Sequence, residues 1–142
     1  MRDREQGFTV IEVLTVLTLA AIVLTLTVPR VSGLLDRLRI DTATAALVAE
    51  VHVARAAAQA RSEPYLVSFS SDRYVVSVRG VPLHETPLPP GVTIDTAMSF
   101  LEVSFSSHGS SSGGFVRLRN RTSSRTVVIP AAAGWAYVMD EP

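Results

Sequence analysis

The sequence contains no cysteine among its 142 residues. A disulfide framework and a thiolate metal site are therefore both excluded. Lysine is absent too, so all thirteen basic residues are arginines, and they balance thirteen acidic residues to a formal net charge of zero. A net charge of zero gives no indication of a nucleic-acid or acidic partner. The length suits one domain with a modest core and one long additional element.

Motifs for catalysis and cofactor binding are missing as well. The sequence has no Gly-x-Ser-x-Gly nucleophile elbow and no phosphate-binding glycine loop. Its three histidines, His52, His84 and His108, do not have the spacing of metal ligands, so we interpret them as surface residues. We therefore predict that the chain is not an enzyme and that it holds no cofactor and no metal.

Charged residues are also nearly missing from residues 8–28. This run consists mainly of Val, Leu, Ile, Ala and Thr, and Glu12 is its one charged residue. As an α-helix it would extend roughly 31 Å, about the thickness of the hydrocarbon core of a bilayer. We predict a transmembrane helix over residues 8–28. The preceding Arg2 and Arg4 favour a cytoplasmic amino terminus, with the rest of the chain outside.

Two simpler interpretations fit this apolar segment less well. A secretory signal peptide has a shorter apolar region and a small-residue cleavage site after it, and the sequence has neither. A plain membrane anchor fits the length but leaves Glu12 unexplained. An acid inside a bilayer is costly, so by default it has a functional partner.

The stretch GFTVIEVL, followed by a long apolar helix, resembles the signature of type IV prepilins. The resemblance implies that residues 1–7 are a leader, that a membrane peptidase cleaves between Gly7 and Phe8, and that Phe8 is then N-methylated. It also implies that Glu12 neutralises the new amino terminus of a neighbouring subunit, because that cation needs a counter-charge in apolar surroundings. Pro29 would kink the helix. The alternative interpretation is that Glu12 is a tolerated acid at the membrane interface.

After Pro29 the apolar residues follow a helical period, which predicts a continuing amphipathic helix over residues 29–62. Two apolar stripes lie on opposite sides of this helix, with charged residues between them. One side should pack on a globular domain, and the other is available for the helices of other subunits in a filament core. The alternative is a helix embedded more deeply in its own domain. The first stripe contains Val31, Leu34, Leu35, Leu38, Ala45, Ala49, Val53, Ala56 and Ala60, and the second contains Ile40, Leu47, Val51 and Ala58.

From residue 63 to residue 142 the apolar period changes to two, which is typical of β-strands. About seven short strands with regular turns predict an antiparallel β-sandwich, or two small sheets, packed against the helix, so the fold class is α+β. We expect a hairpin at Ser71-Asp72, a proline-rich connection over residues 81–91 and a flexible surface loop over residues 106–114. The predicted inward-facing residues are Tyr65, Val67, Phe69, Tyr74, Val76, Val78, Leu101, Val103, Phe105, Val116, Leu118, Val127 and Ile129.

This half of the chain is similar to the GspH/FimT group of minor pilins and pseudopilins. The segments FSSHG, FVRLRN, RTVVIP and GWAYV follow the order of loop and strands in that group. The sequence departs from the group after Gly134, where Trp135 stands in place of the family's arginine.

Four arginines lie between residues 115 and 125 without an acid among them. Arg117, Arg119 and Arg121 alternate, so they share one face if the strand extends to Arg121, and together with Arg125 they are candidates for contacts with DNA phosphates. The alternative is a solvated face that protects a sheet edge. No aromatic residue alternates with the arginines to stack on bases, which favours the alternative. Some FimT-like minor pilins bind DNA through arginines near the carboxy terminus, but the arginine that would follow Gly134 is missing here.

Together the two resemblances imply a minor pseudopilin of the GspH type, a structural subunit of the pseudopilus of a type II secretion system. The expected partners are other pilins through the amino-terminal helices, the prepilin peptidase, the inner-membrane assembly platform and membrane lipid. The chain is expected to cross the bacterial inner membrane once, with its amino terminus cytoplasmic and its β-domain periplasmic, and to enter a periplasmic fibre. The alternatives are a FimT-like minor pilin of a type IV pilus that binds DNA, and an uncleaved single-span protein whose outer domain binds a ligand.

Overall fold

The computed structural model describes residues 9–132 and 134–139 and, within the first helix, only the backbone of residues 26–32. The chain divides into two compact units, one ending at Leu35 and the other beginning at Asp36. Helix α1 (Val10–Arg61) contributes to both units.

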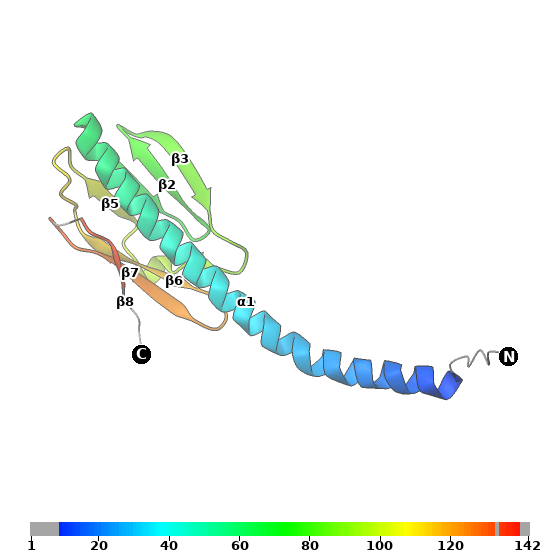
Figure 1. Ribbon diagram of the computed structural model, residues 1–142. Coiled ribbons are helices and arrows are strands. Elements are labelled where there is room, and N and C mark those ends of the chain that lie inside the picture. The colour runs from blue at the N-terminus through cyan, green and yellow to red at the C-terminus, as the bar shows by residue number, and fades with distance from the viewer. Residues whose placement is uncertain (1–8, 133, 140–142) are drawn as a thin grey trace. The chain divides into compact units, whose positions relative to one another are not determined.

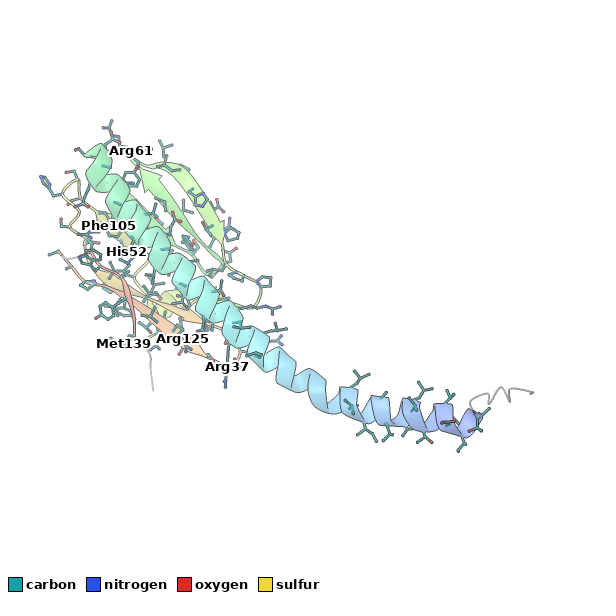
Figure 2. All side chains as sticks on the ribbon, in the orientation of Figure 1. Arg37, His52, Arg61, Phe105, Arg125 and Met139 are labelled. Atoms are coloured by element: carbon teal, nitrogen blue, oxygen red, sulfur yellow. The ribbon has the colours of Figure 1, made fainter. Side chains whose placement is uncertain are left out.

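The first unit consists of the front of α1. The large apolar side chains from Val10 to Leu24 are exposed and project outward around the helix (Figure 2). The hydroxyl groups of Thr15, Thr18 and Thr25 donate to the carbonyl oxygen four residues earlier, at 2.7–2.8 Å, so these polar groups are satisfied within the helix. In the part of the chain that the structure describes, no helix has the length and apolar character needed to cross a membrane.

In the second unit, α1 packs through one side only. Its fully buried residues follow a helical spacing and face the strands, whereas Leu38 and Val53 on the opposite side stay exposed. The second-unit part of the longer predicted stripe is therefore left uncovered by the domain, and it consists of Leu38, Ala45, Ala49, Val53, Ala56 and Ala60. The buried residues of α1 are Ile40, Ala43, Thr44, Leu47, Val51, Ala54 and Ala58.

The helix ends at Arg61 through a left-handed residue. Ser62 has φ of 53°, and the N–H of Glu63 donates to the carbonyl of Ala58 at 3.2 Å, which satisfies an otherwise unpaired carbonyl of the last turn. Pro64 follows and cannot continue the helix. The chain then enters the first strand.

Two four-stranded antiparallel sheets complete the second unit (Figure 1). One has the strand order β3-β2-β1-β5 and the other β4-β6-β7-β8. The helix and both sheets share a single hydrophobic core that includes Leu47, Val67, Phe105 and Leu118, which confirms the predicted α+β class. The strands are β1 (Tyr65–Phe69), β2 (Arg73–Val78), β3 (Val81–Pro87), β4 (Thr93–Ile94), β5 (Glu102–Phe105), β6 (Gly114–Arg119), β7 (Ser124–Ile129) and β8 (Tyr137–Met139), and a short 3-10 helix, η1, covers Thr96–Met98.

The hairpin predicted at Ser71-Asp72 is confirmed. Strands β1 and β2 pair with Phe69 opposite Tyr74, and the N–H of Ser70 donates to the carbonyl of Arg73 at 2.9 Å. Of the inward-facing residues predicted for the strands, most are buried, and Val78 packs on the core while partly exposed. Leu101 is an error of the prediction. Strand β5 begins one residue later, so the Leu101 side chain is exposed and its carbonyl accepts the N–H of Phe69 at 2.7 Å.

The proline-rich connection was also predicted wrongly, because most of it is strand β3. Its Pro82 and Pro87 are accommodated because β3 lies at the edge of its sheet, where one side of the backbone has no strand to pair with. The register between β2 and β3 shifts between Val76 and Ser77, which pair with His84 and Pro82, so Leu83 of β3 is the extra residue beside Pro82. The prolines of this segment exclude a central strand but not an edge strand, and the segment forms the edge strand β3.

The loop over residues 106–114, predicted as a flexible surface loop, is tied into the fold by the hydrogen bonds of its serines. Ser111 is buried, and its hydroxyl donates to the carbonyl of Pro130 at 2.8 Å. The hydroxyl of Ser106 accepts the N–H of Ser110 at 3.2 Å, and Gly109 adopts a φ of 82°. Serine hydroxyls here form hydrogen bonds with backbone N–H and C=O groups that have no partner in a strand or helix. Composition alone does not distinguish such a loop from a serine-rich linker.

Candidate functional site

The amino-terminal signature is only partly within the structure. Gly7 and Phe8, the predicted cleavage and methylation positions, lie outside the described residues. Glu12 lies in the first turn of α1 and is exposed. Its N–H donates to the hydroxyl of Thr9 at 3.3 Å, so Thr9 caps the helix. Thr-x-x-Glu is the sequence pattern of a capping box, and an acid in the first turn is favoured by the helix dipole. Sequence reasoning had missed this local role for Glu12.

Pro29 lies inside α1, among the residues of which only the backbone is described. Its kinking role therefore stays a prediction.

A second candidate for a functional surface is the exposed apolar stripe of α1. Within the second unit it runs from Leu38 through Val53 to Ala60, on the side of the helix away from the core. Leu34 and Leu35, at the end of the first unit, are exposed as well. A helix that packs its own domain through one stripe does not need a second apolar stripe for stability, and exposed apolar surface of this kind is typical of interaction sites.

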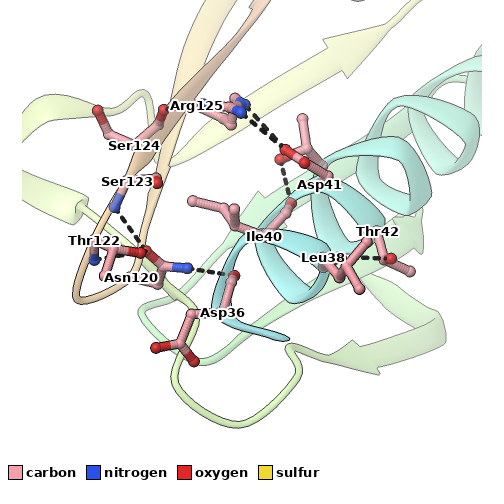
Figure 3. A network of polar contacts seen from close by, with 11 residues as sticks. Asp36, Leu38, Ile40, Asp41, Thr42, Asn120, Thr122, Ser123, Ser124 and Arg125 are labelled. Atoms are coloured by element: carbon pink, nitrogen blue, oxygen red, sulfur yellow. Dashed lines mark hydrogen bonds and ion pairs between the residues drawn. The ribbon is translucent and has the colours of Figure 1, made fainter. Parts of the chain in front are cut away.

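The four arginines of the predicted DNA surface do not share one face. Arg117 and Arg119 lie on β6 and point to the outer side of their sheet. Strand β6 ends at Arg119, so Arg121 falls in the following turn. Arg125 pairs across the sheet with the buried Leu118, and its guanidinium reaches Asp41 of α1 at 3.1 Å (Figure 3). The condition that the strand extends to Arg121 is therefore not met.

Acidic and hydroxyl partners occupy several of these arginines. Arg119 lies 3.6 Å from the carboxylate of Asp95, and Nε of Arg117 donates to the hydroxyl of Thr126 at 3.4 Å. Arg121 lines a small groove of about 230 Å³ together with Asp36, Arg39, Pro90 and Gly91. Neighbouring carboxylates reduce the attraction of this region for phosphate, which favours a structural role for Arg119 and Arg125.

The turn between β6 and β7 is tied to α1 by Asn120. The Asn120 amide donates to the backbone carbonyl of Asp36 at 2.6 Å, and its side-chain oxygen accepts the N–H groups of Thr122 and Ser123 at 3.0 and 2.8 Å (Figure 3). With the ion pair between Arg125 and Asp41, this fixes the start of the second unit's helix against the β6–β7 hairpin. The asparagine carries no sequence motif that would have identified it.

A groove of about 500 Å³ opens at the other end of the second unit. It is lined by His52, Arg55, Ala56 and Gln59 of α1 and by Trp135 and Ala136 before β8. The Arg55 guanidinium carbon lies 4.7 Å from the centre of a Trp135 ring, and the rings of His52 and Trp135 are 5.7 Å apart. Sequence reasoning had not connected these residues. The one available signal was Trp135 itself, which stands where the related group has an arginine.

Two environments shift the pKa of titratable groups. Burial raises the pKa of the Tyr74 phenol above its ordinary value. The hydrogen bond from Arg73 lowers the pKa of Asp72, and Asp72 and Glu85 together raise the pKa of the Arg73 guanidinium. Tyr74 belongs to the core, whereas Asp72, Arg73 and Glu85 are exposed, where ion pairs contribute little to stability. Among the described residues, no three side chains of the metal-ligating types come together.

Comparison with known proteins places these features in a family. Residues 2–28 match the prokaryotic N-terminal methylation motif, and residues 43–133 match the family model described as type II transport protein GspH. No curated protein sequence matches the chain.

Two crystal structures of the type IV minor pilin FimU from Pseudomonas aeruginosa have a similar fold. The first has a TM-score of 0.58 at 14% sequence identity, over 75% of this chain and 91% of that chain. The second has a TM-score of 0.57 at 14% identity, over 70% of this chain and 92% of that chain. The long helix packed on two antiparallel sheets is thus a pilin-like arrangement. Because the GspH match extends over more than half of the sequence, the chain belongs to the GspH family of type II transport proteins.

Proposed function

We propose that this chain is a minor pseudopilin, a structural subunit of the pseudopilus of a type II secretion system. It is made as a precursor, cleaved between Gly7 and Phe8 by the prepilin peptidase and methylated on Phe8. It is held in the bacterial inner membrane by residues 8–28, with the second unit in the periplasm. From there the assembly platform builds it into a periplasmic fibre that takes part in protein export.

The observation that carries this proposal is the order of two matches in one chain. A methylation motif over residues 2–28 is followed by a GspH domain over residues 43–133. The exposed apolar stripe of α1, with Leu38 and Val53 uncovered by the chain's own sheets, gives neighbouring helices a surface to pack on. The proposed role is structural, and the chain is the substrate of the peptidase.

The first test is the intact mass of the protein isolated from membranes of its host. Loss of residues 1–7 together with one added methyl group is the expected result. A full-length mass without methylation would contradict the proposal and would favour an uncleaved single-span protein.

Glu12 is assigned the role of counter-charge to the amino terminus of a neighbouring subunit. The variant Glu12→Gln isolates this charge, because glutamine also suits the third position of a capping box and so preserves the start of the helix. The variant should insert and be cleaved like the wild type yet be depleted from fibres. Normal incorporation would show that the charge has no role in assembly.

The machine to which the fibre belongs is tested by gene deletion in the host. Loss of export of folded proteins with normal pili supports the pseudopilus, whereas loss of pili with normal export supports the alternative of a FimT-like minor pilin. DNA binding under that alternative is tested with the purified full-length chain in detergent. No retardation of DNA at low salt excludes it, and binding that disappears in the Arg117/Arg119/Arg121 triple alanine variant supports it.

A further inference from the structure

The groove at Trp135 is a preformed site whose cation, Arg55, has no acidic partner among the described residues. Arg55 is half-buried, and its Nε donates to the carbonyl of Gly109 at 2.9 Å while its guanidinium lies against the Trp135 ring. None of the six residues that line the groove is an acid. Among the described residues, the terminal nitrogens of Arg55 have no ion-pair partner. A partly desolvated cation of this kind is stabilised when a carboxylate is supplied from outside.

Two glycines leave the space that the side chains of Arg55 and Gln59 occupy. At Gly134, with φ of 64°, a Cβ would lie 2.9 Å from Nε of Arg55, so a side chain there would displace the arginine. At Gly109, with φ of 82°, a Cβ would collide with the side chain of Gln59. The Gln59 amide in turn donates to the carbonyl of His108 at 3.2 Å. The loop over residues 106–114 is thus hydrogen-bonded to α1 through both Arg55 and Gln59, and the guanidinium is oriented before any ligand binds.

The surroundings of Arg55 favour a protein ligand. Trp135 is 62% exposed, and exposed tryptophan beside arginine is the composition of binding hot spots. The groove also includes Ala56, which belongs to the exposed stripe of α1 that is assigned to subunit packing. The surface around the groove is therefore continuous with the surface that neighbouring subunits cover.

We propose that this groove binds an aspartate or glutamate side chain, flanked by an apolar residue, of an adjacent subunit in the same fibre. The carboxylate pairs with the terminal nitrogens of Arg55, a geometry for which the planar guanidinium is suited, and the flanking residue covers the exposed face of Trp135. This inference rests on the proposed function. A nucleic acid is the weaker candidate, because a backbone-binding groove needs a row of cations and only one arginine lines this groove.

The contact is tested by site-specific photo-crosslinking of the full-length chain in its host. A benzoylphenylalanine placed at Trp135 should crosslink to another subunit that carries the amino-terminal methylation motif, with an acidic residue in the crosslinked peptide. The same group at Leu38, on the exposed stripe of α1, reports whether the chain is in a fibre at all. Two results would overturn the proposed contact at the groove and leave the proposed function intact. The first is crosslinking to subunits from position 38 but not from position 135, and the second is crosslinking from position 135 to nucleic acid or lipid only. Crosslinks from neither position overturn both.

The charge is tested at Ala56, an exposed residue that lines the groove. Ala56→Glu places a carboxylate beside Arg55. This carboxylate forms an ion pair with Arg55 within the chain and repels the acidic side chain of the partner. Ala56→Gln has nearly the same size without the charge. Ala56→Glu should lower the crosslinking yield from position 135 by about tenfold or more relative to Ala56→Gln, since like charges at an interface are strongly unfavourable. Equal yields in the two variants would overturn the carboxylate as the ligand.

Discussion

Two valines in the same turn of α1 separate the role of the helix in its own fold from its role in assembly. Val51 is 0% exposed and faces the core, whereas Val53 is 61% exposed on the opposite side. Replacing Val51 with Ala removes two buried methyl groups, a transfer loss of about 1.6 kcal/mol. The cavity left behind raises the loss to about 2–3 kcal/mol. The gain in helix propensity, about 0.5 kcal/mol, is the same in Val53→Ala and cancels in the comparison.

Val51→Ala should therefore be less stable than Val53→Ala by about 2–3 kcal/mol. In urea unfolding of the full-length protein in detergent, followed by far-UV circular dichroism, this corresponds to midpoints about 1–1.5 M apart for a slope near 2 kcal/mol/M. Val53→Ala should stay within about 0.5 kcal/mol of the wild type and instead be depleted from fibres. Equal destabilisation by the two substitutions would refute the assignment of the two faces of the helix.

Three further perturbations test other parts of the second unit. Gly109→Ala should cost about 1 kcal/mol more in thermal unfolding than Gly80→Ala, because both have positive φ but only the side chain at 109 would displace Gln59 from its hydrogen bond with the His108 carbonyl; equal losses would contradict this. Asn120→Asp keeps the acceptor for the turn but loses the donor to the Asp36 carbonyl, so it should destabilise by about 1–2 kcal/mol, and an unchanged unfolding midpoint would mean that the contact is not formed. Because burial raises the pKa of Tyr74, the folded chain retains this proton to a higher pH than the unfolded chain, so stability should fall as pH rises above about 10, less steeply in Tyr74→Phe.

Much of the second unit follows from the sequence because strand alternation directly reflects burial. Tyr65, Val67 and Phe69 alternate with Leu66 and Ser68, and the structure buries the first set. The alternation does not reveal where a strand starts, which is why Leu101 was misplaced. It also does not reveal edge strands such as β3, in which most side chains are exposed and no apolar pattern is needed.

The candidate sites were less predictable because they depend on contacts between segments far apart in the sequence. Arg55 is separated from Gly109 by a large part of the domain, and the pairing of Arg125 with Asp41 likewise joins β7 to α1. The spacing of arginines along β6 gave a common face for Arg117 and Arg119, but only the register between strands shows that Arg125 points to the other side. Spacing within one strand predicts which of its side chains share a face. Which side chains of different strands share a face depends on the register between the strands.

The two stripes of α1 show a limit of hydrophobic patterning that is physical in origin. Burial in the chain's own core and burial against neighbouring subunits both select apolar residues, so hydrophobicity alone cannot tell which stripe faces the domain. Side-chain size does not distinguish them either. The buried side combines Ile40, Leu47 and Val51 with Ala43, Ala54 and Ala58, and the exposed stripe likewise combines Leu34, Leu35, Leu38 and Val53 with Ala45, Ala49, Ala56 and Ala60. Small residues allow helices to approach closely, so neighbouring helices in a fibre should pack most tightly along the alanine segment and with wider spacing beside the leucines.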